Sequence, residues 1–282
     1  LSDGGNLFGV DLYQNRLTLR SETSTVPSNA DLAAAYFSDA DGEELYTTAV
    51  NAVTLNNDVT LYVPPGETFN QTDTITTQGT GGLRIRGTFS AAGTLSVAGS
   101  VSSTGSFTGG VATVNIGGNM VATDYTGTTG TTSVGGTWNV GSFTPNGGRV
   151  RFTGTSTVDA ETFFDLEIDS SGTVSAAGPL IVTNSMILTG GSFAPGPNTH
   201  QVAGTWNDSA ISFAPGEGTI ELTSSSPQIT SAGTNQFNNL TLQDGGTLQS
   251  DIYVAGRLRI AGGQLQAQAN TIEIESEWDN QE

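Results

Sequence analysis

Two acidic segments carry the residues that could do chemistry. They are Asp165-Leu-Glu167-Ile-Asp169 and Glu273-Ile-Glu275-Ser-Glu277. Successive side chains of a β-strand point to opposite faces, so this alternation predicts three carboxylates on one face of each strand. Such a cluster could supply the acid and base of glycoside hydrolysis, or the oxygen ligands of a calcium ion.

Arginines at a fixed distance before these segments favour a structural interpretation. Each of four arginines precedes a carboxylate by the same distance along the sequence. The pairs are Arg149 with Asp165, Arg151 with Glu167, Arg257 with Glu273, and Arg259 with Glu275. If this distance completes one coil, the side chains form ion pairs between coils. An exposed pair contributes only about 0–1 kcal/mol, but a ladder of pairs fixes the register of the strands. Calcium binding and catalysis are the alternatives.

A third acidic segment resembles part of a calcium loop. Asp39, Asp41 and Glu43 alternate along the chain, with Gly42 between the last two. Carboxylates at alternate positions before a glycine converge on hard cations in calcium loops. The segment lacks the distant Glu of a complete loop, so an acidic turn is the alternative. Calcium is the one cofactor that the sequence suggests.

The elements that position these residues belong to a long repeat. Trp138, Trp206 and Trp278 mark three copies of a unit of about 70 residues. After the first two tryptophans, Phe143-Thr-Pro145 corresponds to Phe213-Ala-Pro215. A period of this regularity predicts stacked units that bury their apolar faces on one another. The tryptophans occupy inward positions of their strands, which favours core packing over stacking on sugar rings.

A shorter motif, apolar-x-Val/Ile-x-Gly-x-apolar, predicts the strands themselves. Its copies include Leu95-Ser-Val97-Ala-Gly99-Ser-Val101 and Val114-Asn-Ile116-Gly-Gly118-Asn-Met120. Alternation indicates strands with one face inward, and the glycine indicates a bend or a close backbone approach. Several copies recur at intervals of about 20 residues, which is the length of one solenoid coil. This spacing predicts an all-β β-solenoid over residues 53–282, with about eleven coils. We expect the solenoid to be right-handed.

Residues 1–52 do not follow the repeat. Residues 7–13 and 16–20 predict a hairpin, and residues 30–37 predict a short helix. A solenoid end exposes unpaired strand edges, so we interpret residues 1–52 as a cap or an assembly module.

The composition excludes several classes of function. The net charge is −19, and the chain has no lysine and no cysteine. Phosphate contacts need many Lys and Arg side chains, so nucleic-acid binding is not expected. No stretch approaches about 18 consecutive apolar residues, so no membrane insertion is expected.

The strand motif and its Gly-Thr and Gly-Gly turns resemble the β-helical surface proteins of bacteria. Filamentous-haemagglutinin-type adhesins and autotransporter passenger domains are the families concerned. The resemblance covers about residues 53–280 and rests on the pattern of Leu83-Arg-Ile85-Arg-Gly87 and its copies. It implies a single-stranded parallel β-helix that is secreted or displayed on a prokaryotic cell surface.

The expected function is therefore structural: a fibre or stalk subunit, with adhesion to a carbohydrate or a cell-surface ligand as an added role. The third repeat stops just after Trp278, so either the repeats continue in a longer protein or copies stack head to tail into a filament. The alternative is a β-helix that binds or cleaves polysaccharide, with or without calcium. We do not expect an enzyme, because the single histidine, His200, has no second His or Cys as a partner. We expect His200 at the surface or in a turn.

Overall fold

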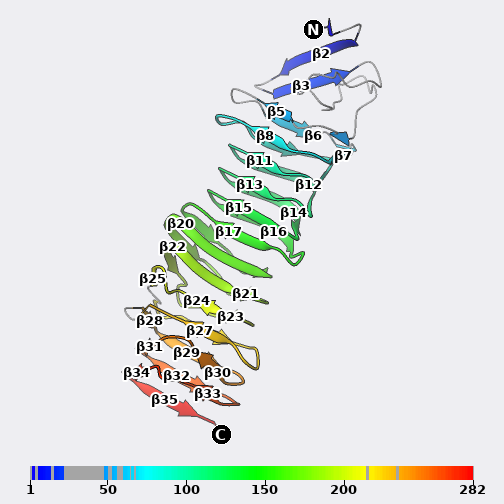
Figure 1. Cartoon of the computed structure of the whole chain (residues 1–282). Helices are drawn as coiled ribbons and strands as arrows, with labels where there is room; N and C mark the ends of the chain where they lie inside the picture. The colour runs from blue at the N-terminus through cyan, green and yellow to red at the C-terminus, as the bar shows by residue number, and fades with distance from the viewer. Residues whose placement is uncertain are drawn as a thin grey trace. The chain divides into compact units, whose positions relative to one another are not determined.

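The computed structural model describes residues 2–3, 6–13, 16–21, 48–49, 53–55, 60–63, 65–66, 68–213, 216–232 and 235–281. The regular structure in this part of the chain is all β, and parallel strands stack into a β-solenoid of about 11 turns (Figure 1). The predicted solenoid and its number of coils are confirmed. The chain divides into two compact units, residues 1–148 and residues 149–282, which are described separately.

The first strands of the first unit are antiparallel. β1 (Ser2–Asp3) pairs with β2 (Asn6–Tyr13), and β2 pairs with β3 (Arg16–Ser21). Tyr13 lies opposite Arg16, which confirms the predicted hairpin. The predicted helix at residues 30–37 lies outside the described residues, and the boundary between residues 52 and 53 stays a prediction.

Two parallel sheets form the solenoid of the first unit. The strands of the first sheet are β4 (Thr48–Ala49), β6 (Leu61–Val63), β7 (Thr68–Gln71), β9 (Leu83–Ile85), β10 (Thr88–Ala91), β12 (Val101–Gly110), β14 (Met120–Thr128) and β16 (Trp138–Thr144). The second sheet contains, in order of pairing, β5 (Val53–Leu55), β8 (Ile75–Thr77), β11 (Leu95–Val97), β13 (Val114–Ile116) and β15 (Thr131–Val134).

The core of this unit consists of columns in which each coil adds one inward side chain. The strand register aligns five aromatic residues, namely Phe69, Phe89, Phe107, Tyr125 and Phe143. Their ring centroids lie 4.7–5.7 Å apart. Offset and edge-to-face pairs at this distance stabilise the stack beyond the burial of apolar area.

Glycines let neighbouring coils approach closely at one corner. The Gly118 amide donates a hydrogen bond to the Gly99 carbonyl oxygen (2.8 Å), and the Gly136 amide donates to the Gly118 carbonyl oxygen (2.9 Å). A β-carbon on Gly118 would lie only 2.8 Å from the Gly99 carbonyl oxygen. The close approach that the motif predicts is therefore confirmed at this position.

Three parallel sheets form the solenoid of the second unit. The first contains β17 (Arg149–Phe152), β18 (Ser156–Val158), β20 (Asp165–Ala176), β22 (Met186–Ala194), β24 (Trp206–Asn207), β25 (Ser212–Phe213), β27 (Gln228–Thr230), β30 (Gly246–Leu248) and β33 (Leu265–Gln266). The second contains β19 (Glu161–Phe163), β21 (Leu180–Val182), β23 (Thr199–Val202), β26 (Thr219–Leu222), β29 (Asn239–Leu242), β32 (Arg257–Ile260) and β35 (Glu277–Asn280). The third contains β28 (Gln236–Phe237), β31 (Ile252–Val254) and β34 (Ile272–Ile274).

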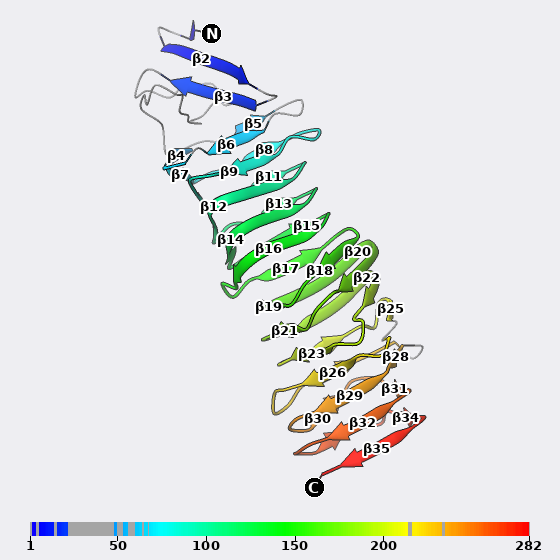
Figure 2. The same ribbon diagram turned by 180° about the vertical axis from the view of Figure 1, so that it is seen from behind.

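The second unit also stacks its inward residues in columns. One column in the second sheet runs through Ile220, Leu240, Leu258 and Trp278. Figure 2 shows the strands of this sheet from behind, with one strand contributed by each coil. Trp206 lies in the first sheet, where it is aligned with Met186 and Ile229. Equivalent tryptophans of the sequence repeat therefore lie on different faces of the solenoid.

Candidate functional site

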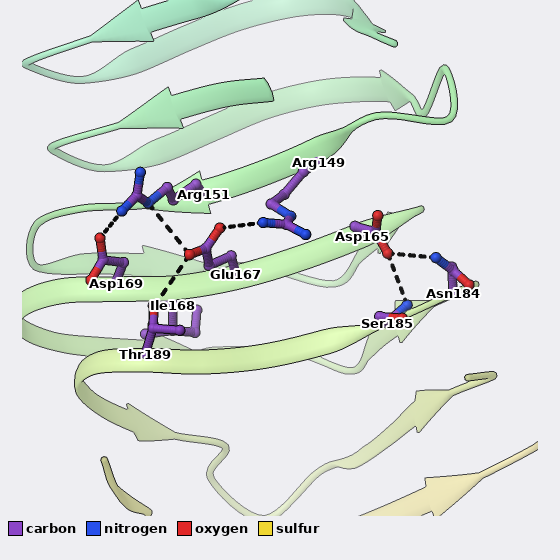
Figure 3. A network of polar contacts seen from close by, with 9 residues as sticks. All are labelled: Arg149, Arg151, Asp165, Glu167, Ile168, Asp169, Asn184, Ser185 and Thr189. Carbon is purple, nitrogen blue, oxygen red and sulfur yellow. Dashed lines mark hydrogen bonds and ion pairs between the residues drawn. The ribbon is translucent and has the colours of Figure 1, made fainter. Parts of the chain in front are cut away.

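The first acidic segment lies in β20, between β17 and β22 in the second unit. Arg149 lies opposite Asp165, and Arg151 lies opposite Glu167, so the distance from each arginine to its carboxylate completes one coil here, as predicted. The outward side chains of these strands form the network of polar contacts in Figure 3.

Two of the ion pairs of this network run diagonally between the two strands, and the third joins directly opposite residues. Arg149 Nη1 lies 2.8 Å from Glu167 Oε2, and Arg151 Nε lies 3.6 Å from Glu167 Oε1. Arg151 also pairs with Asp169 through Nη2. The prediction that Arg149 pairs with Asp165 is corrected: its long side chain leans along the strand and reaches the next outward carboxylate. The predicted pair of Arg151 with Glu167 is present.

Asp165 is bound by the two residues that immediately precede β22, the neighbouring strand on the other side of β20. Its Oδ1 accepts hydrogen bonds from Asn184 Nδ2 (2.8 Å) and from the Ser185 amide (3.0 Å). Thr189 lies in β22 itself, and its Oγ1 donates to Glu167 Oε1 (3.2 Å) or to the Ile168 carbonyl oxygen (3.3 Å). The network thus joins three successive coils, because β20 is connected on both sides.

Burial shows what this network does. The side chain of Glu167 is only 11% exposed, whereas the side chains of Arg149 and Arg151 are 37% and 39% exposed. A mostly buried carboxylate is stable when charged partners and hydrogen-bond donors satisfy its oxygens. Here both oxygens of Glu167 have such partners. The carboxylates therefore bind arginines and amides of neighbouring coils. This is the arrangement expected of a ladder of contacts that fixes the register of the strands.

The second predicted ladder is wrong in its partners. Arg257 lies opposite Glu277, and Arg259 lies opposite Asp279, because the coil from β32 to β35 is longer than the coil from β17 to β20. Arg259 Nε is 3.7 Å from Asp279 Oδ2. Glu273 lies instead in β34, in a different sheet, opposite Tyr253. The pKa of the exposed Tyr253 hydroxyl is raised to about 12, mainly by its hydrogen bond with the Glu275 carboxylate.

His200 is buried, so the prediction of a surface or turn position is wrong. It is only 1% exposed and occupies an inward position of β23, opposite Ile220. Its Nδ1 accepts a hydrogen bond from the Leu180 amide (3.1 Å), and its Nε2 lies 2.9 Å from the Pro195 carbonyl oxygen. These partners fix the neutral tautomer with the proton on Nε2. Burial lowers the pKa of His200, so it is a neutral core residue that serves backbone groups.

Asp208 is a buried carboxylate that the sequence analysis missed. It follows β24 and is fully buried. Trp206, Ser231 and Asn235 surround the side chain, but neither Oδ1 nor Oδ2 has a hydrogen bond of ordinary geometry, and neither has Trp206 Nε1. Burial raises the pKa of Asp208 to about 6. The signal in the sequence was its inward position, because it shares the alternation of the buried Trp206.

The three tryptophans differ in exposure. Trp138 and Trp206 are 4% and 0% exposed, which confirms their predicted place in the core. Trp278 is 52% exposed, so the same prediction is wrong for it. It is aligned with the buried Leu258, but β35 lies at the edge of its sheet in the described part of the chain, and no further coil covers it there.

The structure does not test the predicted calcium site, and the residues that it describes contain no other candidate metal site. Asp39, Asp41 and Glu43 lie outside those ranges. Among the residues that are described, no group of three or more His, Asp or Glu side chains is arranged to hold a metal ion. The part of the chain with a described structure also has no helix of the length and apolar character that a membrane span needs.

Comparisons with known proteins do not assign the chain to a family. The chain matches no protein-family model, and it matches neither a curated protein nor a solved structure.

Proposed function

We propose that the protein is a structural subunit of a fibre or stalk on a prokaryotic cell surface, and that its copies join head to tail. The β-solenoid is consistent with a structural repeat protein. Its resemblance to secreted β-helical surface proteins supports the extracellular location. The high net charge of −19 would keep such a protein soluble outside a filament.

The exposed Trp278 carries this proposal. It lies in the C-terminal coil, which we define as β33, β34 and β35, each at the edge of its sheet among the described strands. Inward residues of this coil that would be buried elsewhere are partly open, namely Leu265, Ile272 and Ile274. An unpaired edge with exposed apolar side chains is a template for another parallel coil.

The equivalent Trp206 indicates what kind of partner fits. It is completely buried because the next coil places Ile229 against it in parallel register. A coil of a second copy, stacked on β35 in the same register, covers Trp278 in the same way. Covering the exposed half of an indole side chain contributes about 2–3 kcal/mol, in addition to the new backbone hydrogen bonds. The C-terminal coil of one copy and the coil of the second copy that covers it are different surfaces. The contact is therefore heterologous, and it extends into a filament.

Sedimentation velocity over about two decades of concentration tests this assembly. The wild-type chain is expected to form a series of larger species as its concentration rises. Trp278→Glu places a charge in the contact and is expected to remain monomeric. Val111→Glu is the matched control, because it changes another exposed apolar residue, which is 70% exposed and lies in the first unit. A wild-type chain that is monomeric at every concentration contradicts the proposal.

A further inference from the structure

The second sheet of the first unit presents two rows of small polar side chains outward. One row lies at the start of the strands and consists of Thr74, Thr94 and Thr113, which immediately precede β8, β11 and β13, and of Thr131, the first residue of β15. The other lies at the centre of the strands and consists of Thr76, Ser96, Asn115 and Ser133. We call these eight residues the hydroxyl array, although one of them, Asn115, carries an amide in place of a hydroxyl. Figure 1 shows its strands β8, β11, β13 and β15 on successive coils, coloured cyan to green.

The register of the hydroxyl array is regular. The pairings of β8, β11, β13 and β15 contain no shift, whereas the pairing of β12 with β14 in the other sheet does. Between the two rows, the inward residues Ile75, Leu95 and Val114 are buried and hold each strand in place. Neighbouring strands lie about 4.7–4.9 Å apart, and residues two apart on one strand are separated by about 6.4–6.8 Å. The array is therefore a two-dimensional lattice with two fixed spacings.

The side chains of the array are neutral and at least partly accessible, and those of its five threonines are rigid. None of its residues is charged or aromatic, although the chain as a whole carries a net charge of −19. Threonine presents a methyl group and a hydroxyl from a β-branched side chain with few rotamers, so little entropy is lost on binding. Thr94 and Thr113 are exposed, and the other members are half-buried. Within the array, Asn115 Nδ2 donates a long hydrogen bond of 3.5 Å to Ser96 Oγ.

A partner that uses all positions of such a lattice must itself be periodic. A small sugar or a peptide would contact one or two positions, each of which contributes little. A solid whose hydroxyl or water oxygens repeat at similar distances contacts every position at once, and the weak contacts add up. Two such solids are ice and a crystalline polysaccharide. The repeat of the array between strands is close to the shorter oxygen–oxygen repeat on the prism faces of hexagonal ice.

We propose that the hydroxyl array is an ice-binding surface. The type of side chain favours ice over a polysaccharide, because flat sugar surfaces are usually bound by exposed aromatic rings. In this unit the aromatic column of Phe69, Phe89 and Phe107 is buried in the core instead. A neutral array also suits ice, which offers no charge to attract. This inference goes beyond the proposed function and does not depend on head-to-tail assembly.

Ice affinity and inhibition of ice recrystallisation test the proposal with three variants. Thr113→Tyr places a bulky side chain on the array, and Thr94→Tyr makes the same change one coil away. Ser102→Tyr is the matched control, because Ser102 is an exposed outward residue of β12 in the other sheet. Circular dichroism and thermal melting identify which variants fold as the wild type does.

The wild type and Ser102→Tyr are expected to enter growing ice and to inhibit recrystallisation equally. A folded Thr113→Tyr or Thr94→Tyr variant is expected to need roughly tenfold or more protein for the same inhibition. The proposal is overturned if the wild type behaves like serum albumin in both assays, or if the array variants match the wild type. Adsorption to crystalline cellulose or chitin without ice activity also overturns it.

Discussion

Trp206 and Trp278 occupy equivalent positions in successive copies of the sequence repeat, but they lie in different sheets of the second unit. Trp206 is aligned with Met186 in the first sheet, and Trp278 is aligned with Leu258 in the second. The repeat therefore does not contain a whole number of coils. Each copy places the same residue types on another face, so the same sequence feature meets a different neighbour in each copy.

The two tryptophans are expected to respond differently to the same substitution. Trp206→Ala leaves a cavity beside Phe213 and Phe237, and is expected to lower the free energy of unfolding by about 3–5 kcal/mol. Trp278→Ala is expected to lower it by about 1 kcal/mol or less in the monomer, because half of its side chain is already in water. Chemical denaturation at low protein concentration measures both. Equal losses would show that the C-terminal coil is covered.

Glu167 is expected to be the most important member of the arginine–carboxylate network. Glu167→Ala removes hydrogen bonds from Arg149 and Thr189, and is expected to destabilise the chain by about 1–3 kcal/mol. Glu217→Ala is the matched control, since Glu217 is exposed, and it is expected to change stability by about 0.5 kcal/mol or less. Thermal melting of both variants measures the difference. A Glu167→Ala variant as stable as Glu217→Ala would refute the role of the network.

Asp208 makes folding more favourable as the pH falls. Its pKa is about 6 in the folded chain and 3.8 in the unfolded chain, so its favourable contribution is complete below about pH 3.8 and lost above about pH 6. The difference of about 2 pKa units corresponds to about 3 kcal/mol. Asp208→Asn keeps the shape and removes the charge. It is expected to stabilise the chain at pH 7.5 and to have little effect at pH 4.

Denaturation midpoints of the wild type and Asp208→Asn at both pH values measure this effect. If the variant is less stable than the wild type at pH 7.5, the carboxylate has a partner that the contacts around Trp206 and Ser231 do not show, and this account of Asp208 is wrong.

His200 acts with the opposite sign. Burial lowers its pKa in the folded chain, so the unfolded chain binds the proton more readily. The stability that it supports is complete above about pH 6.5 and is lost as the pH falls towards the folded pKa. His200→Leu matches the apolar column of Ile220 and Leu240, and is expected to remove this acid sensitivity. It also leaves the Leu180 amide and the Pro195 carbonyl unpaired, at a cost of about 1–3 kcal/mol at every pH.

The difference in stability between wild type and His200→Leu, measured from pH 5 to pH 8, checks this assignment. A difference that does not change with pH would mean that the pKa of His200 is the same in the folded and the unfolded chain, and that burial does not lower it.

The sequence predicts most of the fold because alternation and spacing are local signals. The motif around Gly99 and Gly118 marks both the strands and the close contact between coils, and both are confirmed. The hairpin of β2 and β3 follows from the same alternation. The pairing of Arg151 with Glu167 follows from a coil whose length equals their separation in the sequence.

The error in the second arginine–carboxylate ladder arises because coil length varies. The longer coil after β32 moves Glu273 into another sheet, and no local signal near Arg257 gives that length. The error for His200 has a different cause: its residue type indicates a surface position, whereas its alternation with Val202 in β23 places it inward. The exposure of Trp278 depends on what covers the coil, which the repeat pattern does not encode.

The central claim is head-to-tail assembly through the C-terminal coil, and electron microscopy of the purified chain tests it most directly. We expect unbranched filaments of stacked copies from the wild type and from Val111→Glu. We expect separate single particles from Trp278→Glu under the same conditions. Single particles of the wild type at high concentration, or filaments that persist in Trp278→Glu, would contradict the account.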